Sequence, residues 1–137
     1  MALILDTGPL LAALDRADPE HAACARLLME ATEDLVVPEL VLAELDYWCS
    51  RRLSAEAWPV FLDDVLAGAY RIEAPTHADL RRCRELQATY TDLGLGVVDA
   101  SIVALAERLG EPKVATLDRR HFAAVRPIHV PAFEIRP

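Results

Sequence analysis

Two aspartates follow apolar segments at opposite ends of the chain and are the first candidates for chemistry. Asp6 comes directly after residues 2–5, and Asp118 comes directly after residues 114–117. Short apolar runs of this kind are typical of buried strands, and the carboxyl ends of parallel strands lie at one edge of a sheet. We therefore expect the two carboxylates to lie near each other. The alternative is that each aspartate only caps the helix or turn that follows it.

Glu44 is a third candidate, because of its place on a predicted helix that begins after Pro38. At 100° per residue it falls near the centre of the apolar face formed by Val41, Leu45 and Trp48. A carboxylate that faces the interior is unfavourable unless it is paired or binds a metal. The alternatives are an ion pair with an inward arginine, or a position at the edge of the buried face.

Asp99 is the fourth candidate and lies where a helix begins after the loop of Gly94 and Gly96. Helices that follow strands begin at the carboxyl edge of the sheet, and the positive end of the helix dipole favours an ionised carboxylate there. Taken alone, Asp99 also fits an N-cap.

Four carboxylates in one site require a cation. Two negative charges ~5 Å apart repel by about 3 kcal/mol at an effective dielectric constant of about 20. Oxygen ligands select hard ions, so Mg²⁺ or Mn²⁺ is indicated, and zinc is disfavoured without His or Cys ligands. The chemistry that fits is metal-assisted hydrolysis of a phosphodiester.

The elements that must position these acids alternate along the chain. Apolar runs predict strands at residues 2–5, 35–37, 70–74, 114–117 and 128–135. Periodicity and capping signals predict helices after Pro9, and at residues 19–32, 38–52, 54–69, 76–90, 98–109 and 119–124. Ser54 is expected to cap one of these helices, and Thr76 with Asp79 to form a capping box. The pattern predicts one α/β domain over residues 1–137, with a mostly parallel sheet covered by helices on both faces.

Composition excludes several classes of protein. The chain has 137 residues, of which 53% are hydrophobic and 26% charged, as in ordinary globular domains. No apolar run approaches the ~20 residues of a membrane span, and we expect neither a signal peptide nor a membrane contact. Three cysteines without a CxxC spacing predict no disulfide framework and a reducing, cytoplasmic location.

The net charge of −8 argues against a simple nucleic-acid binder with a basic face. Acids gathered in one pocket can nevertheless coexist with arginines elsewhere, and arginines cluster at residues 51–52, 81–84 and 119–120. The alternative for each cluster is a solvated helix face.

Four segments together resemble a known family. They are LILDT at residues 3–7, VLAEL at 41–45, VVDASIVALA at 97–106 and ATLDRRHF at 115–122. In this order and spacing the chain resembles PIN-domain ribonucleases, in particular the VapC toxins of prokaryotic type II toxin–antitoxin pairs.

The resemblance implies a three-layer α/β/α fold and a role for each matching residue. The matching acidic quartet, expected to hold Mg²⁺ or Mn²⁺ and to be catalytic, is Asp6, Glu44, Asp99 and Asp118. Thr7 and Ser101 match hydroxyl positions beside the first and third acids, and are expected to position a metal-bound water or to orient a carboxylate.

The resemblance also implies an endoribonuclease acting on RNA, with tRNA or rRNA as substrate, a homodimer, and a VapB-type antitoxin that blocks the site. Arg119, Arg120 and His121 are candidates for contacts with RNA phosphates, or alternatively form a solvated turn. Trp48 and Trp58 can stack on bases, but their helical spacing favours packing in the core or a dimer interface. The competing hypotheses are a PIN-type RNA-processing nuclease without an antitoxin, and an inert binding module.

Overall fold

The computed structural model describes residues 1–137 and contains one parallel sheet. Its strands are β1 (Ala2–Leu5), β2 (Asp34–Pro38), β3 (Arg71–Glu73), β4 (Lys113–Ala115) and β5 (Glu134–Arg136). Their order is β3-β2-β1-β4-β5, and every pairing is parallel. Since β1 is central, Ile4 pairs with both Val36 and Val114. The predicted α/β class with a parallel sheet is confirmed.

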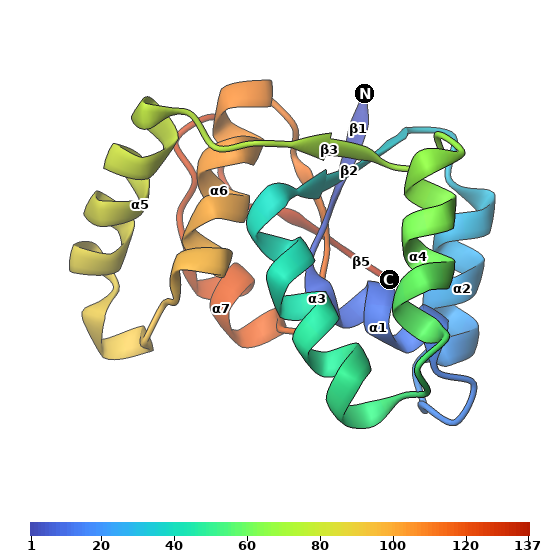
Figure 1. Ribbon diagram of the computed structural model, residues 1–137. Helices are drawn as coiled ribbons and strands as arrows, with labels where there is room; N and C mark the ends of the chain where they lie inside the picture. The colour runs from blue at the N-terminus through green and yellow to red at the C-terminus, as the bar shows by residue number, and fades with distance from the viewer.

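Helices flank this sheet. They are α1 (Thr7–Leu14), α2 (His21–Glu30), α3 (Glu39–Arg52), α4 (Ala57–Leu66), α5 (His77–Thr89), the 3₁₀ turn η1 (Thr91–Leu93), α6 (Val97–Leu109) and α7 (Arg119–Ala124). Figure 1 shows α5 beside α6 at one end of the molecule, and α2 and α4 at the other. Below the carboxyl end of β1, α1 packs against α3 (Figure 1).

The core is built mainly from β1 and α6. All four residues of β1 are buried, as expected for a strand covered on both faces. Seven consecutive residues of α6, 100–106, are also buried, so the middle of this helix is covered on all sides. These two rigid elements carry Asp6 directly after the strand and Asp99 in the first turn of the helix.

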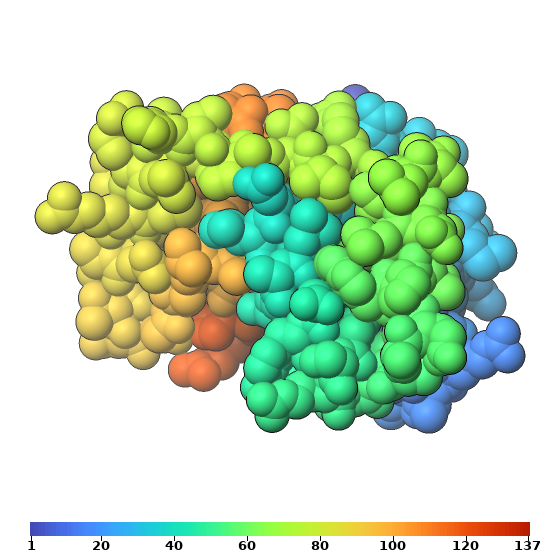
Figure 2. Space-filling view, viewed as in Figure 1, coloured from blue at the N-terminus to red at the C-terminus, as the bar shows by residue number.

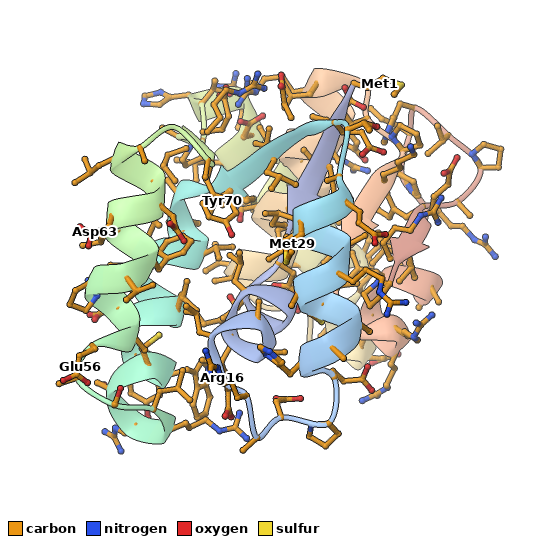
Figure 3. All side chains as sticks on the ribbon, turned by 90° about the vertical axis from the view of Figure 1, so that its right-hand side faces the viewer. Met1, Arg16, Met29, Glu56, Asp63 and Tyr70 are labelled. Carbon is orange, nitrogen blue, oxygen red and sulfur yellow. The ribbon has the colours of Figure 1, made fainter.

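The helix α4 illustrates the amphipathic pattern that the sequence predicts. Figure 3 shows Glu56 and Asp63 on the outer side of this helix and Tyr70 on the inner side. The ring of Phe61 lies 5.3 Å from that of Tyr70 and 5.7 Å from that of Trp58. Trp58 is half-buried against the core, as its spacing predicts.

Helix starts were predicted with mixed success. The capping box is confirmed, because the Thr76 hydroxyl accepts from the Asp79 N–H and the Asp79 carboxylate accepts from the Thr76 N–H. The cap at Ser54 is wrong: α4 begins at Ala57, and its N-cap residue makes no side-chain hydrogen bond. The helix expected from residue 19 begins only at His21, because Asp18 uses its carboxylate to accept from the Glu20 N–H in the turn before it.

Three strands are shorter than predicted, among them β3, which covers Arg71–Glu73 rather than residues 70–74. β4 ends at Ala115, and β5 covers only Glu134–Arg136 rather than residues 128–135. The pairing partner of β5 is the three-residue β4, and Pro131 cannot donate to a ladder, so the preceding residues stay irregular.

None of the helices combines the length and apolar character that a membrane span requires. Cys24, Cys49 and Cys83 are all buried and unpaired.

Candidate functional site

Asp6 is held in one orientation at the carboxyl end of β1. Its Oδ1 accepts a hydrogen bond from the Thr7 N–H, and its Oδ2 accepts one from the Thr116 hydroxyl, both at 2.7 Å. Its own N–H donates to the Ala115 carbonyl at 2.9 Å, which joins the ends of β1 and β4. Only 6% of Asp6 is exposed. The residue is both the N-cap of α1 and a buried carboxylate at the sheet edge.

Asp118 is connected to Asp6 through Thr116. The fully buried Thr116 hydroxyl accepts from the Asp118 N–H at 2.9 Å while it donates to Asp6. Asp118 is in turn the N-cap of α7, accepting from the His121 N–H at 3.2 Å. The capping alternative is therefore correct for both aspartates, and it does not exclude the site.

Thr116 was missed in the sequence. The available signal was a hydroxyl residue two positions before an aspartate at a strand end, a spacing at which Ser and Thr side chains bond to neighbouring backbone.

Asp99 is not an N-cap. That position belongs to Gly96, and Asp99 is the third residue of α6. Its carboxylate is therefore free of a capping bond in the first turn, where the helix dipole favours negative charge.

Glu44 lies at the edge of the buried face of α3. The buried residues of that helix are Val41, Leu45 and Cys49, whereas Glu44 is half-buried. Trp48, expected on the same apolar face, is 37% exposed. The buried face of α3 is thus shifted by one residue from its predicted position, and the side chains of Glu44 and Trp48 lie at its solvent-exposed edge.

The four acids line one cleft of about 660 Å³. The residues that line it are Asp6, Thr7, Gly8, Leu11, Glu44, Trp48, Arg52, Asp99, Leu117 and Asp118. Asp6 follows β1 directly, Asp118 precedes α7, and Glu44 and Asp99 lie in the helices α3 and α6. Figure 2 shows α3 exposed along its length, next to parts of α6 and α7.

Burial and mutual repulsion act on these carboxyls. Burial raises the pKa of Asp6 above its usual value, and the charges of Glu44 and Asp118 add to this, although hydrogen bonds from Thr116 and Thr7 oppose it. The pKa of Asp99 is raised to about 6, mainly by burial and then by the charge of Asp6. The only ion pairs of the four acids are those of Asp99 and Asp118 with His121.

His121 lies beside two of the acids, Asp99 and Asp118. Its Nε2 is 2.9 Å from the Leu93 carbonyl oxygen, which only accepts, so Nε2 carries the hydrogen. Its Nδ1 faces the Oδ2 atoms of Asp118 and, at 3.3 Å, of Asp99. Burial lowers the pKa of His121, but the hydrogen bonds with Asp118 and Leu93 and the two negative charges outweigh it, so the pKa is raised.

The remaining sequence candidates differ in their positions. Thr7 lines the cleft, and its buried Oγ1 has no hydrogen-bond partner. The Ser101 hydroxyl donates to the Val98 carbonyl at 2.7 Å and does not reach the cleft, contrary to its expected role beside Asp99. Arg119 donates to the Pro137 carbonyl, and Arg120 is exposed; neither lines the cleft.

The donor set fits a hard divalent cation. Four carboxylates without a lysine or arginine partner face one space, and an unpaired hydroxyl lies beside them. Asp99, Asp118 and His121 can each offer a ligand atom, all within 4.8 Å of one another. Carboxylate oxygens are preferred by Mg²⁺ and Mn²⁺, and one imidazole is compatible with Mn²⁺.

Comparisons with known proteins agree on one family. The family described as PIN domain matches residues 3–126. The chain is 36% identical to Ribonuclease VapC26 of Mycobacterium tuberculosis over 135 residues, which are 98% of this chain and 100% of that protein.

Solved structures share the fold at lower identity. The VapC20 toxin of Mycobacterium tuberculosis, described as cleaving the sarcin–ricin loop, superposes with a TM-score of 0.83 at 21% identity, covering 98% of this chain and 99% of that one. VapBC2 from Rickettsia felis, bound to a DNA fragment from its promoter, gives a TM-score of 0.71 at 21% identity, with both chains covered completely. The predicted fold is therefore confirmed by known structures.

Proposed function

Because this chain belongs to the PIN-domain family, as one of its VapC-type members, we propose that it is a metal-dependent endoribonuclease and the toxin of a toxin–antitoxin pair. One observation carries the proposal: Asp6, Glu44, Asp99 and Asp118, far apart in the sequence, line the same cleft. The similarity to Ribonuclease VapC26 over the whole length of both chains supports the type of reaction.

Mg²⁺ or Mn²⁺ is the cofactor that we propose, held by these four carboxylates. When bound, such an ion makes water more acidic and stabilises the negative charge that develops on phosphodiester oxygens. Its positive charge would favour the ionised carboxylates against burial and mutual repulsion, which together raise the pKa values of Asp6 and Asp99.

Other residues hold the carboxylates in place for this chemistry. The Thr116 hydroxyl and the Thr7 N–H fix both oxygens of Asp6, so this carboxylate needs no reorganisation on binding a ligand. His121 orients Asp118 and can hold a proton at Nδ1, beside both Asp118 and Asp99. Thr7 is the candidate for a hydrogen bond to water or substrate, because its Oγ1 is otherwise unpaired.

Structured RNA, either tRNA or rRNA, is the proposed substrate, and a VapB-type antitoxin the proposed partner of a homodimer. The VapC20 toxin is described as cleaving the sarcin–ricin loop, and VapBC2 was solved bound to a fragment of its promoter DNA. By family membership we extend both kinds of property to this chain: cleavage of a specific RNA loop and assembly with an antitoxin.

The test is cleavage of purified tRNA and rRNA with and without Mn²⁺ or Mg²⁺. We expect site-specific fragments with either ion, none in EDTA, and a loss of at least about a hundredfold in Asp99→Asn, since even residues that only support metal ligands cost 10–100-fold. Asp92→Asn is the matched control, because Asp92 is exposed in η1 and does not line the cleft. Cleavage that persists in EDTA, or equally in Asp99→Asn, contradicts the proposal.

A second experiment separates a toxin from an RNA-processing nuclease. Induced expression of the chain alone in a bacterial host should arrest growth, and Asp99→Asn should not. Cleavage in vitro without growth arrest would favour the processing role.

A further inference from the structure

One face of α3 carries an acid, an aromatic ring and a cation in a row. Glu44, Trp48 and Arg52 are each four residues apart, so they lie on one side of the helix, with about 6 Å of helix rise between neighbours. All three line the cleft. Trp48 and Arg52 have no role in holding the acids, and their position beside them calls for an explanation.

We propose that Trp48 and Arg52 form a nucleotide subsite for single-stranded RNA, with a base stacked on the indole and a phosphate held by the guanidinium. This inference rests on the proposed function and deepens it. A phosphodiester at the acids belongs to a strand whose neighbouring nucleotides must pass along the same cleft, and these two side chains form part of its wall.

Trp48 has the exposure and the support that a stacking platform needs. It is 37% exposed, although its neighbour Leu45 is fully buried on the same helix. The ring of Tyr47 contacts it edge-on, with centroids 5.1 Å apart and an interplanar angle of 80°. The guanidinium carbon of Arg52 lies 5.4 Å from the indole centroid. The indole is thus held by two neighbours while part of it remains open, and bases of any sequence stack on such rings.

Arg52 supplies the positive charge that a polyanion needs in this cleft. The protein has a net charge of −8, and four carboxylates line the same space. Arg52 makes no ion pair within the chain, because every ion pair involves other residues. Its planar guanidinium is therefore free to bind phosphate oxygens through two parallel hydrogen bonds.

The chain contains its own control for this arrangement. One residue earlier on α3, Arg51 stacks on Tyr47 at 4.8 Å, in the same kind of aromatic–cation pair. Neither of these two residues lines the cleft. If RNA bound nonspecifically to the aromatic and basic side chains of α3, both pairs would contribute equally to the affinity. The proposed subsite requires that Trp48 and Arg52 contribute more than Tyr47 and Arg51.

The test measures binding without cleavage, so that it does not depend on catalysis. Trp58→Phe leaves Trp48 as the only tryptophan of the chain. This protein is titrated, in the presence of Mg²⁺, with a 2′-O-methyl oligoadenylate decamer and with an abasic decamer of equal charge. We expect saturable quenching of Trp48 fluorescence by the decamer with bases, and little quenching by the abasic one.

Variants then separate the base from the phosphate contribution. In the otherwise wild-type protein, Trp48→Ala should weaken decamer binding roughly five- to hundredfold, the range seen when a stacked base loses its aromatic partner. Arg52→Ala should weaken it and lower the slope of log affinity against log salt by about one, whereas Arg51→Ala should retain nearly full affinity. Circular dichroism verifies that each variant is folded.

Several results would overturn the subsite. They are absent quenching, equal quenching by the abasic decamer, or decamer affinity that Trp48→Ala leaves unchanged. If Trp48→Ala instead alters only the sedimentation of the protein, the surface joins two copies of the chain and the RNA subsite is wrong. If the wild type cleaves RNA but none of the expected binding effects appears, the subsite is wrong and the proposed function stands. If the binding effects appear but no RNA is cleaved, the proposed function is wrong and the subsite stands.

Discussion

Two buried aspartates of this protein have opposite surroundings. Asp79, 4% exposed, closes the capping box of α5, and the Nε of Arg108 donates to both of its oxygens at 3.2 and 3.0 Å. Asp6, 6% exposed, receives hydrogen bonds only from the neutral Thr7 and Thr116. It also faces other negative charges, which raise its pKa in addition to the effect of burial.

The other acids near Asp79 and near Asp6 differ in the same way. Between α5 and α6, Arg82 donates to both oxygens of Glu107 at 2.8 and 2.9 Å, so the acids of this region are balanced within the chain. Of the four carboxylates that line the cleft, Asp99 and Asp118 pair with one histidine, His121, and Asp6 and Glu44 form no ion pair. Removing the cation that pairs with a buried acid destabilises a fold, whereas buried acids that have no such partner indicate a site that an external cation completes.

The largest effect that this comparison predicts is on activity. Asp6→Asn should reduce RNA cleavage at least about a hundredfold, because it removes a charge from the proposed metal site. Asp79→Asn should leave the activity per folded molecule unchanged. Cleavage rates at saturating Mn²⁺, normalised to folded protein by circular dichroism, provide the measurement, and similar losses in both variants would break the comparison.

The second effect is on stability, and here the loss is expected at Asp79 rather than at Asp6. Asp79→Ala should lower the free energy of unfolding by about 2–3 kcal/mol, since it removes a helix cap and a charged hydrogen bond from Arg108. Asp6→Asn in metal-free buffer should be at least as stable as the wild type, because it relieves repulsion. Urea denaturation of both variants decides this, and a large loss in Asp6→Asn would assign Asp6 a structural role instead.

The third prediction concerns pH and follows from the pKa of Asp99. Its value is raised from 3.8 to about 6 in the folded protein, so the folded state binds this proton more tightly than the unfolded state. The free energy of unfolding contributed by Asp99 therefore falls as pH rises from about 4 to about 6, and is constant above that range. His121 acts in the same direction at its own raised pKa, where its favourable charge is lost as pH rises.

Denaturation in EDTA from about pH 4 to about pH 7 compares the wild type with Asp99→Asn. The variant should gain stability relative to the wild type as pH rises through this range. A difference that stays constant with pH would show that the Asp99 carboxyl is not perturbed in the folded protein.

The smallest effect is expected for Thr116. Thr116→Val keeps the shape but removes the hydroxyl that joins Asp6 to the Asp118 N–H. We expect about a tenfold loss of cleavage, typical of a residue that orients a metal ligand, and about 1–2 kcal/mol of stability. Weaker Mn²⁺ binding should accompany the loss, and unchanged Mn²⁺ affinity would mean that Asp6 is oriented without Thr116.

The sequence predicted what depends on local patterns. Buried parallel strands, the capping box at Thr76 and the strand-end position of Asp6 all follow from short-range periodicity and side-chain chemistry. The proximity of Asp6 and Asp118 was predicted because parallel strands share one carboxyl edge, and Asp99 was placed there as a residue at a helix start. Glu44 was selected only by its place on the apolar face of its helix.

Other features depend on tertiary contacts that no local pattern encodes. The orientation of His121 is determined by the Leu93 carbonyl, 28 residues away in the chain. The link from Thr116 to Asp6 spans 110 residues. The exposure of Trp48 depends on how far α3 is rotated about its axis relative to the sheet. Because the buried face includes Cys49 instead of Trp48, Trp48 is exposed rather than buried.

The most direct test of the central claim is Mn²⁺ binding followed by the electron paramagnetic resonance signal of the free ion. Glu44→Gln is compared with Glu39→Gln, a charge change on the same helix at an exposed residue outside the cleft. The account predicts that the wild type and Glu39→Gln bind Mn²⁺ equally, and that Glu44→Gln binds at least about tenfold more weakly. No uptake by the wild type, or equal uptake by Glu44→Gln, would contradict it.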